Sequence, residues 1–308
     1  MTAYEKPTVE ITEVDVVLSK YFGSNVTEIT PLKGGNLSAV FSFSVFDNEY
    51  VIKFSDLEGS FETEKFISTL LTSKGISFPQ CVGLGKYKLL NYLISEKING
   101  HNLASSSLEQ QRRMLPEVIH ILKLMNQVEL GKTSGYGTIN ASGNGTYNSW
   151  NEYVIATNAE DQEGTFWEGW YSLFETSCLE KDVFFECYNR LISYSKYNES
   201  HRYFIHGDFH QWNILSDGQK ITGIIDSNGK YGDFLVDLAT LDWHLKKLNV
   251  IEVYQNYQHQ QGITIPNFKE RLIGAKYYNG LIGLRFYAKM GWNDAYFSLR
   301  DELLSLTN

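Results

Sequence analysis

Three side chains that can bind a metal ion or handle a proton lie close together in the chain: Asp208, Asn213 and Asp226. Asp208 follows the apolar triplet 203–205, and Asp226 follows a second apolar segment at 221–225. The polar turn that follows Asn213 predicts a hairpin carrying all three groups. In phosphoryl transfer one such group meets the attacking hydroxyl and two hold Mg²⁺ against the phosphates of a nucleotide. The spacing therefore suits a phosphoryl-transfer site.

A lysine earlier in the chain fits the same chemistry. Lys53 lies in the strand-like segment 50–54, where it is either an edge-strand lysine that extends into water or a lysine directed at nucleotide phosphates. The second role needs a glutamate partner on the next predicted helix, where Glu62 and Glu64 are both available. We favour Glu64, because it shares a helix face with apolar residues and would point inward. Together with the downstream hairpin, Lys53 is expected to anchor phosphates.

Two neighbouring glycines precede a strand and supply a weaker signal. In Gly34-Gly35-Asn36-Leu37-Ser38, the amide of Gly35 and the hydroxyl of Ser38 could approach phosphates closely. The same glycines are also ordinary turn residues.

Other polar residues near the hairpin have simpler interpretations. His206 and His210 flank Asp208 and raise the alternative of a zinc site, but neither a helical H-E-x-x-H pattern nor a cysteine pair supports it. We expect His206 to pack under the loop and to hydrogen-bond its backbone. Asp237 lies near the start of a predicted helix and is expected to brace that helix start or the loop.

Three residues of the same predicted helix could contact the substrate: Asp242, Trp243 and His244. Core packing is the ordinary role of a tryptophan at such a position.

The pattern of the chain indicates an α+β fold with two lobes. A helix at 11–22, a hairpin at 40–54, a helix at 62–73 and strands at 80–84 and 92–98 form a small β-rich lobe, taken as 1–100. The remainder, 101–308, is mostly helical. Its expected helices cover 108–127, the stretch after Trp150, 235–248, 250–260, 268–290 and 294–306, and a glycine-rich ordered loop covers 133–148.

Composition excludes several classes of protein. The 308 residues are 43% hydrophobic and 20% charged, which is ordinary for a globular protein. A net charge of −9 argues against a nucleic-acid surface and would attract cationic small molecules. No window approaches the roughly 18 apolar residues that span a membrane. Three cysteines without C-x-x-C spacing lead us to expect buried free thiols. A polar N-terminus leads us to expect a cytoplasmic protein, and we expect a monomer.

The residues quoted above, with a later Gly-Asp-(three residues)-Asp-Leu-Ala at 232–239, resemble the aminoglycoside phosphotransferases, relatives of the protein kinases. Segments around 40–53, Phe78-Pro79, the Thr-Ser-Gly-Tyr-Gly at 133–137 and Trp150 look like the branch that acts on hygromycin B. The resemblance covers roughly residues 10–300, nearly the whole chain.

This resemblance implies a bilobal kinase-like fold that binds ATP or GTP with Mg²⁺ between its lobes. It makes Asp208 the catalytic aspartate, Asn213 and Asp226 the magnesium ligands, and Lys53 with Glu64 the phosphate anchor. Backbone groups near Glu96 and Ile98 would meet the purine. The implied activity is phosphorylation of a hydroxyl on a cationic, sugar-containing antibiotic, which confers resistance.

Two departures from the family pattern leave the substrate open. The family usually has Trp after the metal-binding aspartate, where this chain has Ser227-Asn228, and Pro where it has Phe234. A metabolic kinase of the same fold, acting on choline, an amino alcohol or a sugar, fits the motif equally well. A non-catalytic kinase-like binding protein is the alternative from another class, and the intact motif argues against it.

Overall fold

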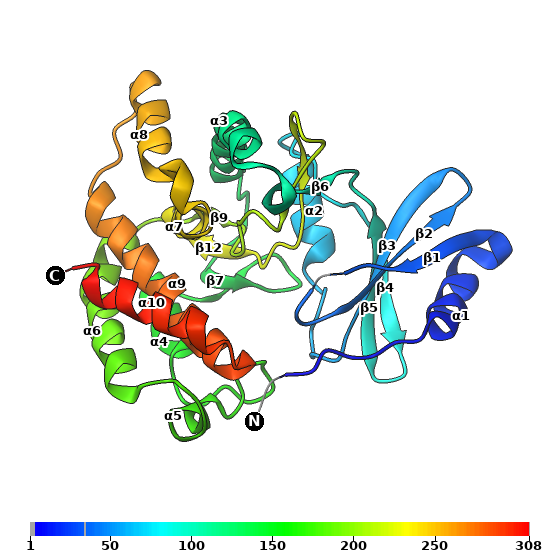
Figure 1. The fold of residues 1–308 in the computed structure, drawn as a ribbon, viewed down its shortest axis with the longest axis horizontal. Coiled ribbons are helices and arrows are strands. Elements are labelled where there is room, and N and C mark those ends of the chain that lie inside the picture. The colour runs from blue at the N-terminus through cyan, green and yellow to red at the C-terminus, as the bar shows by residue number, and fades with distance from the viewer. Residues whose placement is uncertain (1–3, 34, 308) are drawn as a thin grey trace.

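The computed structural model describes residues 4–33 and 35–307. It has a small lobe built around one sheet and a large lobe built mostly of helices, as the sequence predicts (Figure 1). The fold class is therefore confirmed, while the division at residue 100 stays a prediction. The elements of the small lobe are α1 (Ile11–Phe22), β1 (Val26–Pro31), β2 (Ala39–Val45), β3 (Asn48–Ser55), α2 (Glu64–Thr72), β4 (Cys81–Tyr87) and β5 (Leu90–Glu96).

The small lobe is an antiparallel sheet with the strand order β1-β2-β3-β5-β4. Residues of β2 alternate between buried and partly exposed, so that Phe41, Phe43 and Val45 face a core. Helix α1 adds Val14 and Leu18 to that same core and lies beside the sheet (Figure 1). The central strand β3 is thereby held on both edges, and Lys53 on it has a fixed position.

The large lobe combines helices with two small sheets. Its strand orders are β8-β7-β12-β9 and β11-β10-β6. Its elements are β6 (His101–Asn102), α3 (Leu108–Asn126), β7 (Tyr136–Ile139), β8 (Gly145–Tyr147), α4 (Trp150–Thr157), α5 (Leu173–Thr176), α6 (Lys181–Asn198), β9 (Tyr203–Ile205), β10 (Ile214–Ser216), β11 (Ile221–Ile224), β12 (Lys230–Gly232), α7 (Leu235–His244), α8 (Val250–Gln260), α9 (Phe268–Met290) and α10 (Asn293–Ser305).

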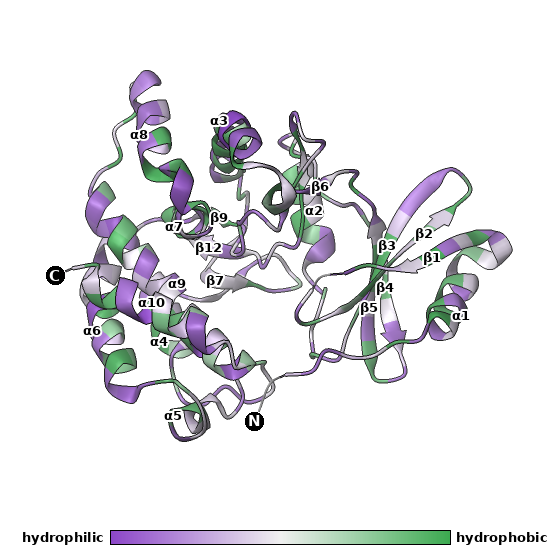
Figure 2. Cartoon of the chain, in the orientation of Figure 1, coloured by the Kyte–Doolittle hydropathy of each residue, from purple (hydrophilic) through white to green (hydrophobic). Residues whose placement is uncertain are grey.

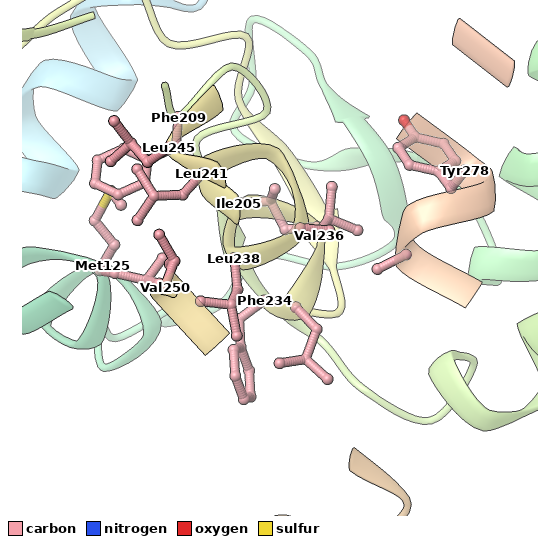
Figure 3. Close-up of a cluster of buried hydrophobic side chains, with 14 of the residues drawn as sticks. Met125, Ile205, Phe209, Phe234, Val236, Leu238, Leu241, Leu245, Val250 and Tyr278 are labelled. Carbon is pink, nitrogen blue, oxygen red and sulfur yellow. The ribbon is translucent and has the colours of Figure 1, made fainter. Parts of the chain in front are cut away.

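A second and larger core fills this lobe. Figure 3 shows part of this core. There Phe209 lies close to Met125 of α3, to Leu241 of α7 and to Leu245, the residue that follows α7. Helix α2 contributes Ile67 and its neighbour Leu71 to this core, so α2 packs against the large lobe although the chain reaches it from the small sheet. Helices such as α6 and α8 carry both hydrophilic and hydrophobic residues, as helices with one face on a core do (Figure 2).

Three local predictions are corrected by the structure. Asp208 lies in a loop rather than on a hairpin with Asn213 and Asp226, because β9 pairs with β12 while only β10 and β11 form the hairpin. The glycine-rich segment 133–148 contains the paired strands β7 and β8 instead of a loop alone. Strand β5 ends at Glu96, and helix α7 ends at His244, both earlier than predicted.

The cysteines agree only in part with the expected buried free thiols, because Cys187 is buried while Cys81 and Cys178 are partly exposed. Cys81, Cys178 and Cys187 are all free thiols. In the described ranges, the helices are all too short or too polar to cross a lipid bilayer.

An ion pair lies at the centre of the large lobe. Asp233 is fully buried and accepts two hydrogen bonds of 2.8 Å from the guanidinium of Arg271 on α9. Asn198, the last residue of α6, donates a further 2.8 Å bond to Asp233. These contacts link α6 and α9 to the start of α7.

Breaking this buried pair should destabilise the fold. Asp233→Asn leaves Arg271 buried without a counter-charge, and we expect unfolding to become easier by about 3–5 kcal/mol. Urea denaturation monitored by circular dichroism measures the change. Lys74→Met is the control, since its partner Glu129 is largely exposed and such pairs contribute at most about 1 kcal/mol. Equal costs for the two variants would contradict the role given to Asp233.

Candidate active site

The loop between β9 and β10, residues 206–213, is held from two directions. Phe209 is buried in the large core. Asp237 of α7 accepts the backbone N–H of His206 at 2.7 Å and that of Gly207 at 2.9 Å, which confirms the predicted loop-bracing role. Burial raises the pKa of the Asp237 carboxyl to about 7, while the two amides lower it. Asp208 is thus attached to a rigid loop.

His206 is buried beneath this loop, as expected. Its backbone carbonyl accepts hydrogen bonds from the N–H of Asn228 and the hydroxyl of Ser227. Its buried ring nitrogens make no hydrogen bond to residues 207–213 among those described, and the backbone of Ile225 is the polar group that acts on the ring. Burial lowers the ring pKa to about 4, which leaves it neutral at neutral pH.

The zinc alternative receives no support from the arrangement of side chains. Among residues 4–33 and 35–307, no group of three or more His, Cys, Asp and Glu side chains is placed to hold a metal ion. His206 is enclosed, and His210 is engaged with Asp208.

The side chain of Asp208 is 49% exposed. Its Oδ1 lies 3.1 Å from Nε2 of His210, whose Nδ1 accepts a hydrogen bond from the backbone N–H of Trp212. The His210 ring therefore donates from Nε2 to Asp208. Burial of the carboxyl against the loop opposes ionisation of Asp208, but the hydrogen bond from His210 and the charge of Lys230 hold its pKa below the ordinary value.

Asn213 joins Asp208 to the hairpin. Its Nδ2 donates to the backbone carbonyl of Asp208 at 3.0 Å and to Oδ2 of that residue at 2.9 Å. Within the described residues nothing donates to Asn213 Oδ1, which leaves an amide oxygen for a cation. The backbone carbonyl of Asn213 accepts from the N–H of Ile225, which brings the next residue, Asp226, toward the same side.

Asp226 has an unusual backbone conformation and an open side chain. Its φ is +59°, in the left-handed region that aspartate tolerates better than most residues. Its side chain is 44% exposed. An amide oxygen and a carboxylate are oxygen ligands of the kind Mg²⁺ prefers, so Asn213 and Asp226 fit that ion.

Lys53 reaches across from the small lobe to this point. Its ammonium forms an ion pair with Oδ1 of Asp226. Glu64, buried at the start of α2, lies close enough that its charge favours the ammonium, whereas Glu62 is exposed. Burial lowers the pKa of Lys53 and raises that of Glu64, and each charge opposes the shift of the other. The structure thus brings Lys53, Glu64 and Asp226 together.

The glycine loop is covered by a segment that sequence analysis did not single out. Gly35 has a φ of +69°, and its carbonyl accepts from Lys6 at 3.2 Å; Gly34 lies outside the described residues. The Tyr4 hydroxyl donates to Asp56, and the Tyr4 ring packs edge-on against Phe166 of the large lobe at 5.5 Å. Tyr4 therefore touches both lobes.

Ser38 and the purine-side residues Glu96 and Ile98 belong to the small lobe and to its connection with the large lobe. Ser38 is partly buried and directly precedes β2. Glu96 ends β5, and Ile98 follows in the connection between the lobes, packed near Gly223 of β11. Their contacts with a nucleotide stay predictions.

The three substrate-binding candidates on α7, Asp242, Trp243 and His244, have different surroundings in the structure. His244 lies with its ring centroid 4.7 Å from that of His210, and burial lowers its pKa to about 4. Asp242 pairs with Lys276 at 2.8 Å, and Trp243 donates its indole N–H to Glu302. Only His244 of the three contacts a neighbour of Asp208. Sequence analysis named His210 only for the zinc alternative and did not name Lys230. The H-G-D-F-H order was the available signal that His210 could orient Asp208.

Solved structures with the same fold are similar over nearly the whole chain. The crystal structure of aminoglycoside phosphotransferase APH(4)-Ia matches with a TM-score of 0.80 at 20% identity, covering 96% of this chain and 98% of that one. A protein from Haemophilus somnus 129PT that is assigned as a fructosamine-3-kinase matches with a TM-score of 0.66 at 15% identity, covering 97% and 98%.

Sequence comparison agrees with this likeness. Hygromycin-B 4-O-kinase from Escherichia coli is 24% identical over 239 residues, which are 77% of this chain and 68% of the relative. The model of the phosphotransferase enzyme family (APH) matches residues 28–271, most of the chain and all of the site described above apart from the Tyr4 segment. This chain belongs to the phosphotransferase enzyme family.

Proposed function

We propose that this protein transfers the γ-phosphoryl group of ATP or GTP to a hydroxyl of an aminoglycoside-type antibiotic, with a hygromycin-like compound as the first candidate, and so confers resistance. One observation carries the proposal. Lys53 from the small lobe meets Asp226 at the point where Asp208 and Asn213 are hydrogen-bonded to each other. A phosphate-anchoring cation, two oxygen ligands and a proton acceptor thus converge in one place.

Each group has a role in this mechanism. Asp208, ionised and oriented by His210, would align the acceptor hydroxyl and take its proton as the bond to phosphorus forms. Lys53, supported by Glu64, would hold nucleotide phosphates, with Gly35 and Ser38 above them and backbone groups near Glu96 and Ile98 at the purine. Positioning and charge neutralisation supply most of the catalysis in such reactions.

Magnesium fits the two remaining ligands. Asn213 would bind it through Oδ1, since Nδ2 is engaged with Asp208, and Asp226 would bind it through its exposed carboxylate. The ion supplies neutralisation of phosphate charge when it is bound. Asn213 directly precedes β10 and Asp226 closely follows β11, so both lie at the open end of the hairpin, and the pairing of the two strands sets their separation.

The relatives support the choice of substrate class. Hygromycin-B 4-O-kinase is named for phosphorylation of hygromycin B, and APH(4)-Ia has been solved in a ternary complex with AMP-PNP and hygromycin B. The net charge of −9 favours a cationic substrate. His244, neutral beside His210, would not repel such a substrate.

A metabolic kinase acting on a sugar or an amino alcohol is the second candidate. The acidic groups around α7 are already paired: Asp242 with Lys276 and Glu302 with Lys246. Paired carboxylates attract a polycationic antibiotic less than free ones do. The likeness to the Haemophilus protein shows that the same fold occurs in a protein assigned to sugar-amine phosphorylation.

An acceptor panel tests the proposal. The wild-type protein is incubated with Mg²⁺ and ATP or GTP and with aminoglycosides, choline, amino alcohols and sugars, and gain of phosphate is measured by mass spectrometry. We expect phosphorylation of an aminoglycoside. Asp208→Ala should lower kcat by about 10²–10⁴-fold without loss of nucleotide binding, because it removes the proton acceptor but no phosphate contact.

Asp217→Asn is the matched control, since this exposed aspartate occupies the turn of the same hairpin and should leave turnover unchanged. Phosphate gain on a metabolite alone would favour the second candidate. Near-normal turnover by Asp208→Ala on the true substrate would refute the catalytic assignment.

A substitution at Asp226 examines the metal. Asp226→Asn keeps a residue that accepts a left-handed backbone but removes the charge that the cation needs. We expect the Mg²⁺ concentration for half-maximal activity to rise by at least about tenfold, with nucleotide binding weakened in parallel. Titration of activity against Mg²⁺ measures this, again beside Asp217→Asn. An unchanged magnesium requirement would exclude Asp226 as a ligand.

A further inference from the structure

A lysine lies buried directly behind the catalytic loop. Lys230 opens β12, where its backbone pairs with Thr138 of β7 on one side and with Ile205 of β9 on the other. The residue is only 6% exposed. Burying an ammonium is costly unless charges and hydrogen bonds compensate it. An apolar residue would fill this strand position more cheaply, so the ammonium needs an explanation.

The ammonium of Lys230 is in close contact with the backbone that precedes Asp208. Its Nζ donates to the carbonyl of Asn228 at 2.8 Å. A Cβ placed on Gly207 would lie 2.4 Å from the carbonyl oxygen of Asn228 and 2.6 Å from this Nζ, so the loop passes closely over both groups. The φ of +79° and the contact with the Asn228 backbone are what require glycine here. Lys230 thus supports the loop from below at the residue next to Asp208.

Two carboxylates and one imidazole face this ammonium. The charges of Asp208, at the tip of the loop, and of Asp237, on α7, both favour protonated Lys230. His206 is the third group, and it is neutral. The strand neighbours Thr138 and Ile205 carry no charge. Burial lowers the pKa of Lys230 to about 8, so it remains an ammonium at neutral pH.

The ammonium of Lys230 offsets the repulsion between the carboxylates of Asp208 and Asp237. Asp237 is fully buried, and the charge of Asp208 makes its ionisation harder, whereas Lys230 makes it easier. Asp237 needs its negative charge to hold the amides of His206 and Gly207 strongly. Loss of the ammonium would leave two carboxylates facing each other through the loop.

We propose that Lys230 is a positioning residue for phosphoryl transfer: its ammonium, bonded to the Asn228 carbonyl, lying against Gly207 and attracted by Asp208 and Asp237, keeps the loop 206–213 in the conformation that presents Asp208 to the acceptor. The inference rests on the proposed function. Lys230 acts through Asp208 and Asp237, and its contacts with Asn228 and Gly207 place it behind the loop rather than in front of it.

Lys230→Met tests the proposal, because methionine keeps the length of the chain and removes the charge. Lys220→Met is the matched control, since Lys220 is exposed in the β10–β11 turn. We expect kcat of Lys230→Met to fall by at least about thirty-fold, while KM for the nucleotide changes by less than about twofold. Lys220→Met should match the wild type in both quantities.

The pH profile of kcat at saturating substrates separates a positioning role from a structural one. The ammonium is the active form, so wild-type kcat should fall as pH rises through about 8. Lys220→Met should show the same fall, and Lys230→Met should lack it. Substrate and nucleotide titrate identically in all three proteins, so their ionisation cannot produce a difference.

Several outcomes would overturn the inference. They are a wild-type kcat that stays constant between pH 7 and 9, a Lys230→Met enzyme within about twofold of wild type, or an alkaline loss that persists in Lys230→Met. The first needs no variant and holds even if Lys230→Met fails to fold. If the wild type phosphorylates no acceptor, the proposed function fails, and the same comparison is made on slow hydrolysis of the nucleotide by water, for which the expectation is unchanged.

Discussion

The conformation of the loop between β9 and β10, residues 206–213, depends on one buried carboxylate. Asp237 accepts the amides of His206 and Gly207, and the next residue along the loop is Asp208. Helix α7 can position that carboxylate because its apolar residues, Leu238 and Leu241 among them, are fully enclosed in the large core. Packing of the core therefore determines where α7 lies, α7 determines where the loop runs, and the loop determines where Asp208 points.

The two halves of the site are held by different parts of the molecule. Asp208 and Asn213 are bonded to each other within the large lobe, whereas Lys53 belongs to the small sheet and meets Asp226 across the boundary. Under the proposed function, phosphates and a cation come between Lys53 and Asp226. Their charges then act on the ligand and the cation instead of on each other.

Local patterns in the sequence were sufficient for most elements but not for long-range pairing. The helix predicted at 268–290 has the bounds of α9, because its apolar spacing is regular over many turns. Asp208 was expected in a loop, but on the same hairpin as Asn213 and Asp226. That hairpin assignment is wrong, since strand β9 pairs with β12, whose residues carry no strand pattern. Lys230 gave no signal for the same reason: a lysine in a short polar stretch indicates a surface, and only the pairing of β12 with β7 and β9 buries it.

The left-handed backbone of Asp226 restricts how this protein can change over evolution. Among residues with a side chain, aspartate and asparagine enter this region with the least strain, and β-branched or bulky ones are strongly disfavoured. Under the proposed function, only aspartate of those two brings a charge to the cation. Conformation and charge together then favour aspartate at position 226. Substitutions that change the acceptor substrate would instead occur at neighbours such as Ser227 and Asn228, where neither a left-handed backbone nor a negative charge is required.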